Sequence, residues 1–330
     1  MPKRKVESVN EVGEEGELGR LVDFGFSRQT IERLINAGVK SLRHILLFNA
    51  EELQELLGSP DTDLPRRLIN TARELLAEQP IAIVAKERVE ALSRMPVLKT
   101  GVDGLDNAVG GLRFGASHEF AGEFGTGKTI MALQTAIASI SQFGFRVVYV
   151  DTEKTIDQYL PSQLIKSMCN RFGVDYERVI SDYLLVYNPA TVDDLEDFIK
   201  LKLTDLVINN NVKVIVVDSI TALYRAQFRG REKLAERQQR LHYVLDWLRR
   251  LTIRLGVLVI YTNQVMTSPT GYIEVKLPVG GNVLAHTVNA RWLMVRASKS
   301  KNEGVMRALD VPGLPPGFEV KYVIGDDGLH

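Results

Sequence analysis

One short stretch of the chain has the residue types and spacing that hold a chain of phosphates. It reads Gly122-Glu123-Phe124-Gly125-Thr126-Gly127-Lys128-Thr129, which fits the pattern G-x-x-x-x-G-K-[ST]. The glycines let successive backbone N–H groups turn inward around phosphate oxygens, Lys128 reaches the β- and γ-phosphates, and the Thr129 hydroxyl binds Mg²⁺. A helix that begins here adds its positive N-terminal end. The stretch therefore predicts a site for ATP and Mg²⁺.

Polar residues that suit the same chemistry follow three apolar, β-branched runs. Residues 147–150 end at Asp151-Thr152-Glu153, residues 214–217 end at Asp218, and residues 257–261 lead to Asn263-Gln264. Such continuous runs are typical of strands buried on both faces of a parallel sheet.

Segments with helical spacing lie between these runs, at residues 130–140, 164–172 and 241–255. The alternation predicts an open α/β sheet, whose ligands bind at the carboxyl ends of its strands. We therefore expect Glu153, Asp218 and Gln264 to converge on the phosphate-binding stretch.

The composition is that of a folded, globular protein. Of 330 residues, 45% are hydrophobic and 25% are charged, and the length suits one sizeable domain plus a smaller one. Cys169 is the one cysteine, so no internal disulfide can form, as expected in a reducing cytoplasm. No apolar stretch approaches about 20 residues, so we expect no membrane-spanning segment and no membrane partner. The histidines are scattered, which does not favour a zinc site.

The formal net charge is zero, which excludes a uniformly basic nucleic-acid binder but not a local basic surface. One basic segment holds Arg225, Arg229, Arg231, Lys233, Arg237 and Arg240, and a second holds Arg291, Arg296, Lys299, Lys301 and Arg307. Two interpretations stay open at this point, because a run of charges can be a solvated face or a surface for phosphodiesters.

Composition divides the chain into four parts. Residues 1–17 are charged and poor in apolar groups, which predicts a disordered tail. Residues 18–79 show short helical patterns and predict a small all-α domain. Residues 80–96 are expected to form a linker helix, and residues 97–330 the α/β core.

Several ordered phrases resemble one family. They are residues 98–106 (LKTGVDGLD), 218–221 (DSIT), 234–239 (LAERQQ), 262–265 (TNQV), 277–286 (LPVGGNVLAH) and 310–315 (DVPGLP). In this order they are similar to the RecA superfamily, and specifically to archaeal RadA recombinases and their eukaryotic counterparts. The resemblance covers about residues 96–330 well and the N-terminal part loosely. It implies a RecA-like ATPase core after a small helical domain of degenerate helix-hairpin-helix type.

The resemblance also implies roles for individual residues. Residues 122–129 would hold the ATP phosphates, Asp218 would position Mg²⁺ through water, and Glu153 would activate the attacking water. Gln264 would sense the γ-phosphate, and His286 would couple the nucleotide state to the loop between them. Asp310 and Pro312 belong to a segment that one protomer lays over its neighbour's ATP, so the site would be shared between protomers.

Two segments correspond to DNA-binding loops that face the axis of a helical filament: residues 225–234 and 266–281. The DNA-binding residues expected from them are Arg225, Arg229, Arg231, Lys233, Arg237, Lys276, Gly280 and Gly281. The implied partners are single- and double-stranded DNA, further copies of the chain in a filament or ring, and other recombinase subunits.

Three segments differ from the family pattern. The family polymerises through a Phe-x-x-Ala anchor in the linker, whereas this linker reads Ile81-Ala82-Ile83-Val84-Ala85 and has no phenylalanine. The run after Glu153 is longer, and Gln163 stands where an arginine is expected. In the N-terminal part, Asp23-Phe24-Gly25-Phe26-Ser27 replaces a Gly-Val-Gly hairpin.

These observations lead to two main hypotheses. The first is a DNA-dependent ATPase, located in the cytoplasm at the nucleoid, that binds single-stranded DNA and promotes homologous pairing and strand exchange in recombinational repair. The second is a RadA-like paralogue that binds ATP and assists another recombinase without exchanging strands itself. A hexameric helicase or clock-type ATPase on the same core is a third alternative, against which the phrase at residues 280–286 argues.

Overall fold

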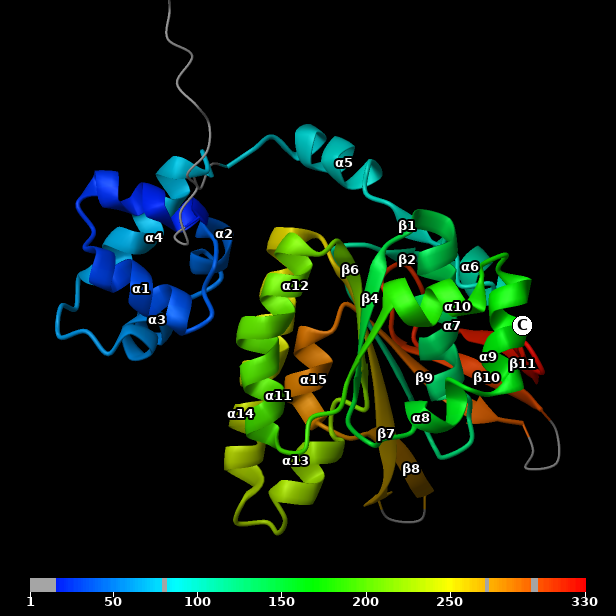
Figure 1. Ribbon diagram of the computed structural model, residues 1–330. Coiled ribbons are helices and arrows are strands. Elements are labelled where there is room, and N and C mark those ends of the chain that lie inside the picture. The colour runs from blue at the N-terminus through cyan, green and yellow to red at the C-terminus, as the bar shows by residue number, and fades with distance from the viewer. Residues whose placement is uncertain (1–15, 79–81, 271–272, 298–301) are drawn as a thin grey trace, which may run out of the picture. The chain divides into compact units, whose positions relative to one another are not determined.

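The computed structural model describes residues 16–78, 82–270, 273–297 and 302–330, with backbone alone for residues 267–270 and 273–276 (Figure 1). The chain divides into two compact units, Met1–Ala82 and Ile83–His330, and each unit is described by itself. No helix among the described residues is long and apolar enough to cross a membrane.

The first unit is a cluster of short helices. They are η1 (Gly16–Phe24, a 3-10 helix), α1 (Arg28–Asn36), α2 (Leu42–Ile45), α3 (Ala50–Leu57) and α4 (Leu64–Leu75). Side-chain caps define the starts of two of them: Ser27 caps α1, and Asn49 and Glu52 form a reciprocal capping box at α3, as expected where unpaired backbone N–H groups need acceptors. The helices bury Leu21 and Ile31 in a small apolar core.

Most of the predicted N-terminal tail lies outside the described residues. The prediction was wrong for Gly16 and Glu17, which begin η1. The Glu17 carboxylate accepts a hydrogen bond from the backbone N–H of Leu42 at 3.2 Å, and this contact at the start of α2 holds η1 against the unit.

The linker helix is shorter than the sequence pattern indicates. Helix α5 spans Ala85–Ser93, whereas we expected a helix over most of residues 80–96. Val84 has an extended backbone (φ −62°, ψ 139°), which fits the weak helix preference of the β-branched residues at Ile83 and Val84. No residue of α5 is buried, and the two β-branched side chains are 51% and 66% exposed.

A sheet of ten strands forms the centre of the second unit, in the order β12-β11-β10-β9-β3-β7-β6-β4-β5, with β8 paired to β7. The strands are β3 (Ser117–Gly122), β4 (Arg146–Asp151), β5 (Leu184–Tyr187), β6 (Val212–Asp218), β7 (Leu258–Thr270), β8 (Ile273–Pro278), β9 (Ala290–Arg296), β10 (Glu303–Asp310), β11 (Glu319–Gly325) and β12 (Gly328–Leu329). A separate pair consists of β1 (Val97–Leu98) and β2 (Leu112–Arg113).

The middle of this sheet is parallel, from β9 through β3, β7, β6 and β4 to β5, and β10 to β12 extend it with antiparallel pairs. This confirms the mixed α/β fold with a large, mostly parallel sheet and a helical N-terminal region. All three predicted strands are present, as β4, β6 and β7, because their apolar runs are buried between two layers of helices.

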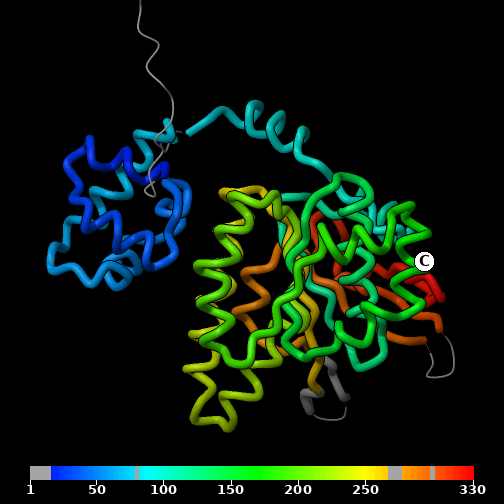
Figure 2. The backbone as a smooth tube through the Cα atoms, viewed as in Figure 1, coloured from blue at the N-terminus to red at the C-terminus, as the bar shows by residue number. Residues whose placement is uncertain are grey.

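Helices cover both faces of the sheet (Figures 1 and 2). They are α6 (Asp103–Val109), α7 (Lys128–Phe143), α8 (Ile156–Tyr159), α9 (Gln163–Arg171), α10 (Tyr176–Arg178), η2 (Val179–Tyr183), α11 (Val192–Asp197), η3 (Phe198–Leu203), α12 (Thr204–Asn209), α13 (Ala222–Gln227), α14 (Leu234–Leu255) and α15 (Gly281–Thr287). Helix α7 lies on one face, and α11, α12 and α14 lie together on the other. The predicted helical segments correspond to α7, α9 and α14.

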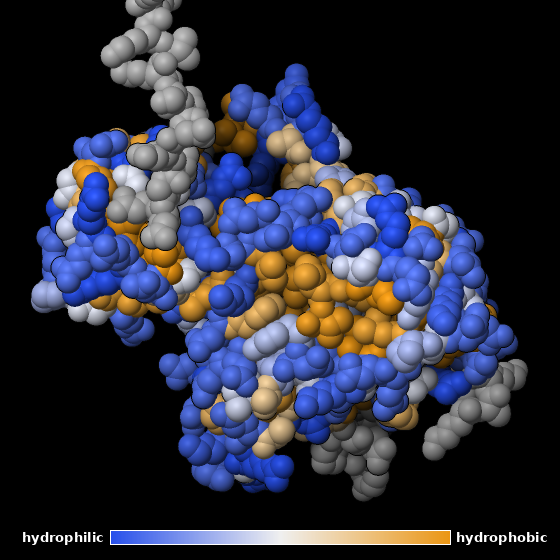
Figure 3. All heavy atoms as spheres, viewed as in Figure 1, coloured by the Kyte–Doolittle hydropathy of each residue, from blue (hydrophilic) through white to orange (hydrophobic). Residues whose placement is uncertain are grey.

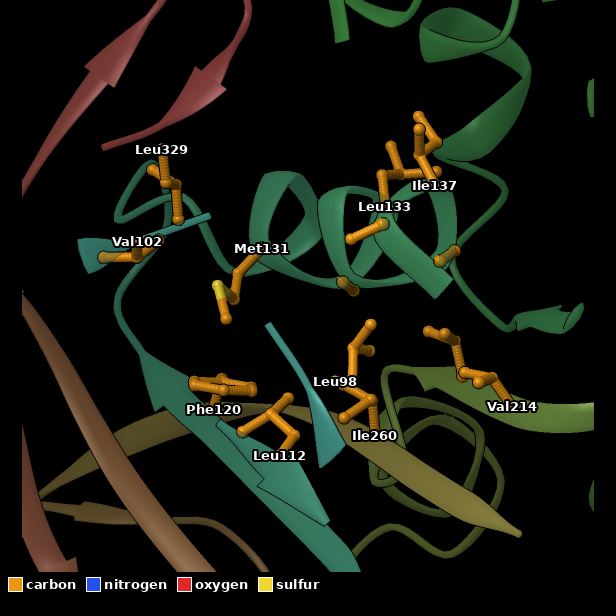
Figure 4. Close-up of a cluster of buried hydrophobic side chains, with 14 of the residues drawn as sticks. Leu98, Val102, Leu112, Phe120, Met131, Leu133, Ile137, Val214, Ile260 and Leu329 are labelled. Carbon is orange, nitrogen blue, oxygen red and sulfur yellow. The ribbon is translucent and has the colours of Figure 1, made fainter. Parts of the chain in front are cut away.

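The packing of α7 fixes the start of the phosphate-binding stretch. In Figure 4 the side chains of Met131, Leu133 and Ile137 project from this helix, and Phe120 of β3 and Ile260 of β7 lie in the same cluster. All five are buried, and such side chains contribute about 1.5–3 kcal/mol each when fully buried. The turn between β3 and α7 is therefore held at both ends.

The sheet ends at β5, whose Val186 is 36% exposed. The face of the second unit in Figure 3 carries an apolar area bordered by hydrophilic residues, over the region where β4 and β6 are labelled in Figure 1. An open strand edge of this kind is a surface to which another extended segment can add.

Candidate active site

Strand register brings the predicted polar strand ends together. Gly122 at the end of β3 pairs with Gln264 on β7, and Asp151 at the end of β4 pairs with Asp218 at the end of β6. Because β6 also pairs with β7, these ends lie along one edge of the sheet. The predicted convergence of the strand ends is confirmed.

The phosphate-binding stretch has the backbone that its glycines predict. A Cβ atom on Gly122 would lie 2.5 Å from the Met294 carbonyl oxygen and 2.7 Å from Thr126 Oγ1, so only glycine fits. Gly127 has φ +93° and is the N-cap of α7, a conformation that glycine adopts without strain. The loop therefore presents the N-terminus of a 16-residue helix to whatever it holds.

Lys128 lies within this loop and close to three acids. Its Nζ donates to the Glu123 carbonyl oxygen at 2.8 Å. Burial lowers the pKa of Lys128, and the negative charges of Asp218, Glu153 and Glu123 oppose that effect. The ammonium group is thus directed at the space in front of the strand ends, where phosphate oxygens would replace the carbonyl as its acceptor.

Asp218 is buried and held from two sides. Tyr149 Oη donates to its Oδ2 at 2.6 Å, and Thr262 Oγ1 donates to its Oδ1. Burial, and then the neighbouring Asp218 charge, raise the pKa of Tyr149, so this phenol remains a donor. Each carboxylate oxygen keeps a further lone pair, which suits an acid that holds Mg²⁺ through a water while Thr129, at the start of α7, binds it directly. Thus the residues present fit the metal.

Glu153 and Gln264 are in direct contact. Gln264 Nε2 donates to Glu153 Oε1 at 2.9 Å, and Gln264 Oε1 accepts a hydrogen bond from Arg225 Nη1 at 2.5 Å. Arg225 belongs to α13, the first element after β6. The acid that follows β4, the amide on β7 and a cation of the first basic segment therefore form one chain of hydrogen bonds.

A buried polar network next to this chain of hydrogen bonds was missed by sequence reasoning. Asn263 Nδ2 donates to Glu119 Oε1 and to the Val279 carbonyl oxygen, while its Oδ1 accepts from Thr221 Oγ1 at 2.8 Å. Arg291 Nε donates to the other Glu119 oxygen at 2.6 Å. The network joins the start of α13 to both ends of the β7–β8 hairpin. The signal that could have revealed it was Glu119, an acid next to Phe120 just before the phosphate-binding stretch, in a strand whose residues are all buried.

The predicted cations of the first basic segment differ in their surroundings. Arg229 Nε donates to the Ala226 carbonyl oxygen at 3.0 Å, and Lys233 pairs with Glu236 at 2.8 Å. Arg231 is exposed, and Arg237 on α14 is half-buried. Arg240, also in this segment, is bound to Asp193 and Glu196 of α11, so it holds α14 in place.

The second predicted DNA-binding segment forms a hairpin rather than a loop. Strands β7 and β8 continue it as an antiparallel pair, in which Thr267 pairs with Lys276. The alternation at Ile273, Val275 and Leu277 is a strand pattern. The Lys276 side chain lies outside the described residues. Gly280 (φ +102°) caps α15, which begins at Gly281.

Two cations of the second basic segment are only partly exposed. The Arg291 guanidinium pairs with the buried Glu119 carboxylate, which favours a structural role for this residue. Arg296 lies beside the phosphate-binding loop, with its Nη1 3.7 Å from the position of a Cβ on Gly125. Sequence reasoning missed this second positive charge at the loop. Lys299 and Lys301 lie outside the described residues.

Asp310 and Pro312 lie at and after the end of β10, which is separated from β3 and its phosphate-binding loop by β9. Asp310 ends β10 at a register shift opposite Arg291, and Pro312 follows in an exposed turn. No described contact joins either of them to the phosphate-binding loop of the same chain. Their predicted place over a neighbouring protomer's ATP stays a prediction.

The comparison with protein families decides the classification. The Rad51 family model matches residues 88–330. This chain belongs to the Rad51 family. Members of the Rad51 family are DNA-dependent ATPases of recombination that use ATP with Mg²⁺. The predicted membership of the RecA superfamily is therefore confirmed, and the matched range begins within α5 and includes the whole sheet.

Proposed function

We propose that this Rad51-family chain is an ATPase that assembles on single-stranded DNA and promotes homologous pairing and strand exchange in DNA repair. The observation that carries the proposal is the hydrogen-bond chain from Glu153 through Gln264 to Arg225. It joins the acid suited to hydrolysis with a segment suited to DNA, so ATP and DNA can influence each other.

Hydrolysis follows from the residues at the strand ends. Residues 122–129 bind the phosphates of the ATP substrate, with Lys128 at the β- and γ-phosphates. Glu153 orients a water for attack on the γ-phosphorus and accepts its proton as the bond to the β–γ bridging oxygen breaks. Mg²⁺, when held by Thr129 and by Asp218 through water, would neutralise charge on the phosphate oxygens.

DNA binding follows from the first basic segment and the β7–β8 hairpin. Guanidinium groups bind phosphodiesters without reading sequence. We assign single-stranded DNA to Arg225, Arg229, Arg231, Lys233, Arg237, Lys276, Gly280 and Gly281. The site would be completed by Asp310 and Pro312 of a neighbouring protomer, so that ATP favours assembly by linkage.

The test is a joint-molecule assay with a labelled single strand, a homologous duplex, ATP and Mg²⁺. We expect joint molecules from the wild-type protein and none from Lys128→Ala, which removes the cation from the phosphate site. A wild-type protein that neither binds single strands in an ATP-dependent manner nor forms joint molecules would overturn the proposal.

A second candidate is a mediator that binds ATP and a partner recombinase but exchanges no strands. It is favoured by the linker, where the exposed aliphatic side chains of Ile83 and Val84 replace an aromatic anchor. Mass measurement with an ATP analogue and single-stranded DNA separates the two functions. Long filaments support the recombinase, whereas small, discrete complexes support the mediator.

A further inference from the structure

We propose that Arg225 is a positioning residue that restrains Glu153 until DNA draws its guanidinium away. The inference rests on the proposed DNA-dependent ATPase. It gives Arg225 a role in the timing of hydrolysis, in addition to the contact with DNA expected of a basic residue in this segment.

The geometry is a relay of two hydrogen bonds through one amide. Arg225 Nη1 donates to Gln264 Oε1, and Gln264 Nε2 donates to Glu153 Oε1. One of the two oxygens with which Glu153 could orient a water is therefore engaged, and its side chain is held towards Gln264.

The charges at the two ends fix which way the amide faces. A guanidinium group can only donate, and an ionised carboxylate can only accept. The amide oxygen must consequently face Arg225 and the amide nitrogen must face Glu153. If the guanidinium leaves, this constraint is lost and the Gln264 amide can rotate. Glu153 is then released, and the amide of Gln264 can contact the γ-phosphate.

Arg225 is held close to Gln264 by the elements around it. Thr221, just before α13, donates its hydroxyl to Asn263, the neighbour of Gln264 on β7. Tyr224, next to Arg225 on α13, is buried. The short helix is thus fixed to the sheet, while the Arg225 side chain itself is exposed and can be reached from solution.

DNA competes directly for this guanidinium. A phosphodiester carries a full negative charge, whereas Gln264 Oε1 is a neutral amide oxygen, and charge-assisted hydrogen bonds are roughly twice as strong as neutral ones. A strand bound along the first basic segment therefore withdraws Arg225 from Gln264. Neighbouring cations cannot replace it in the relay, because Arg229 and Lys233 are held by Ala226 and Glu236.

The test compares ATP turnover without DNA and at saturating single-stranded DNA for the wild type and Arg225→Ala. We expect Arg225→Ala to raise the DNA-free kcat about two- to fivefold with little change in KM, since a partly exposed charged contact has an effect of this size. The stimulation by DNA should fall by the same factor. Thermal unfolding at the wild-type temperature shows that the variant is folded.

Two further variants make the result specific. Arg225→Lys keeps a donor for Gln264 Oε1 and should restore a DNA-free kcat near that of the wild type. Lys321→Ala removes an exposed positive charge on β11, outside the segments assigned to DNA, without touching Gln264. It should leave both the DNA-free kcat and the stimulation at saturating DNA unchanged.

An Arg225→Ala protein with the wild-type DNA-free kcat and the wild-type stimulation would overturn the inference. Failure of the proposed function gives a different result, namely wild-type turnover that is indifferent to DNA. Even then the DNA-free comparison of Arg225→Ala with Arg225→Lys decides whether Arg225 restrains Glu153.

Discussion

Gln264 is the residue at which the parts of the candidate site meet. Its side chain contacts Glu153 and Arg225, its backbone N–H bonds Asn263 Oδ1, and its backbone pairs with Gly122. An amide side chain has a donor and an acceptor, so it can bind an anion and a cation at the same time. At the scale of residues, the site is a set of opposite charges separated by one amide.

Glu153→Gln should separate nucleotide binding from hydrolysis. The substitution removes the base while keeping the volume, so we expect turnover to fall at least about 100-fold and bound ATP to persist. Single-turnover hydrolysis and filter binding measure the two quantities. Asp157→Asn, an exposed change on α8, is the control and should behave as wild type. Undiminished hydrolysis in Glu153→Gln would make this acid structural.

The sequence predicted which residues end the strands but not what they contact. Apolar runs are local, so β4, β6 and β7 could be predicted, and the polar residue after each run followed. Tyr149, Thr262 and Glu119 lie inside β4, β7 and β3, and their partners come from other strands. Only the strand register decides those contacts, and register depends on packing across the whole sheet.

At the scale of elements, β3 is unusual because it buries two ionisable residues. It lies in the centre of the sheet with all its residues buried, and it includes His118 and Glu119. Neither ring nitrogen of His118 has a hydrogen-bond partner among the described residues. Burial lowers its pKa from 6.5 to about 4, so the folded protein strongly favours the neutral ring.

His118 should make stability depend on pH. Its pKa is lower in the folded state than in the unfolded state, so its contribution is complete above pH 6.5 and is lost as the pH falls towards about 4. We expect about 2 kcal/mol less free energy of unfolding at pH 5 than at pH 8 from this group. Urea denaturation followed by the fluorescence of Trp247 and Trp292, both in the second unit, measures it.

His118→Leu is the matched variant for this measurement, because it keeps a similar volume without a titrating ring. Its stability should change less between the two pH values, by about the same 2 kcal/mol. His242→Leu, at an exposed position on α14, should retain the wild-type pH dependence. An identical pH dependence in His118→Leu and the wild type would show that the ring is solvated.

The segment between α13 and α14 should set the salt dependence of DNA binding. Arg231 is exposed there, and in the part of the chain that the structure describes it has no ion-pair partner. Arg231→Ala should weaken binding to single-stranded DNA and reduce the slope of log K against log salt by about 0.7, the release from one phosphate. Fluorescence anisotropy across a salt series gives the slope. Lys321→Ala on β11 is the control, and a wild-type slope in Arg231→Ala would locate DNA elsewhere.

The β7–β8 hairpin differs from the loop that the family resemblance implies for these residues. Residues 266–281 were expected to be a loop by resemblance alone, yet β7 continues to Thr270 and β8 returns through Val275 and Leu277. The alternation was present in the sequence. Pro269 and Gly271, residue types that commonly interrupt strands, make this alternation less evident.

At the scale of the whole molecule, we expect the linker to govern which other chains the second unit can join. Ile83 and Val84 are exposed ahead of α5, Val84 has an extended backbone, and β5 leaves a strand edge open. Burying two such side chains on a neighbouring copy would contribute about 1.5–3 kcal/mol each. We therefore expect the absence of an aromatic anchor to lower, but not to remove, the driving force for assembly.

Ile83→Asp combined with Val84→Asp should abolish large assemblies. Light scattering with an ATP analogue and single-stranded DNA should show a high mass for the wild type and the mass of a single chain for the double variant. Ile253→Asp, which charges an equally exposed aliphatic residue on α14, should assemble as the wild type does. Full-size assemblies from the double variant would exclude the linker as the anchor.

The unbroken course of β7 makes the hairpin a lever. From Gln264 to Thr270 the strand advances about 20 Å, at about 3.4 Å per residue, while its other half is clamped between β3 and β6. A tilt of about 10° at Gln264 would then displace the far end by about 3.5 Å, close to the rise of about 3.4 Å per base along the axis of a DNA duplex. A small movement beside the bound ATP would thus become a displacement of several ångströms at the far end of the hairpin, where we propose that DNA binds.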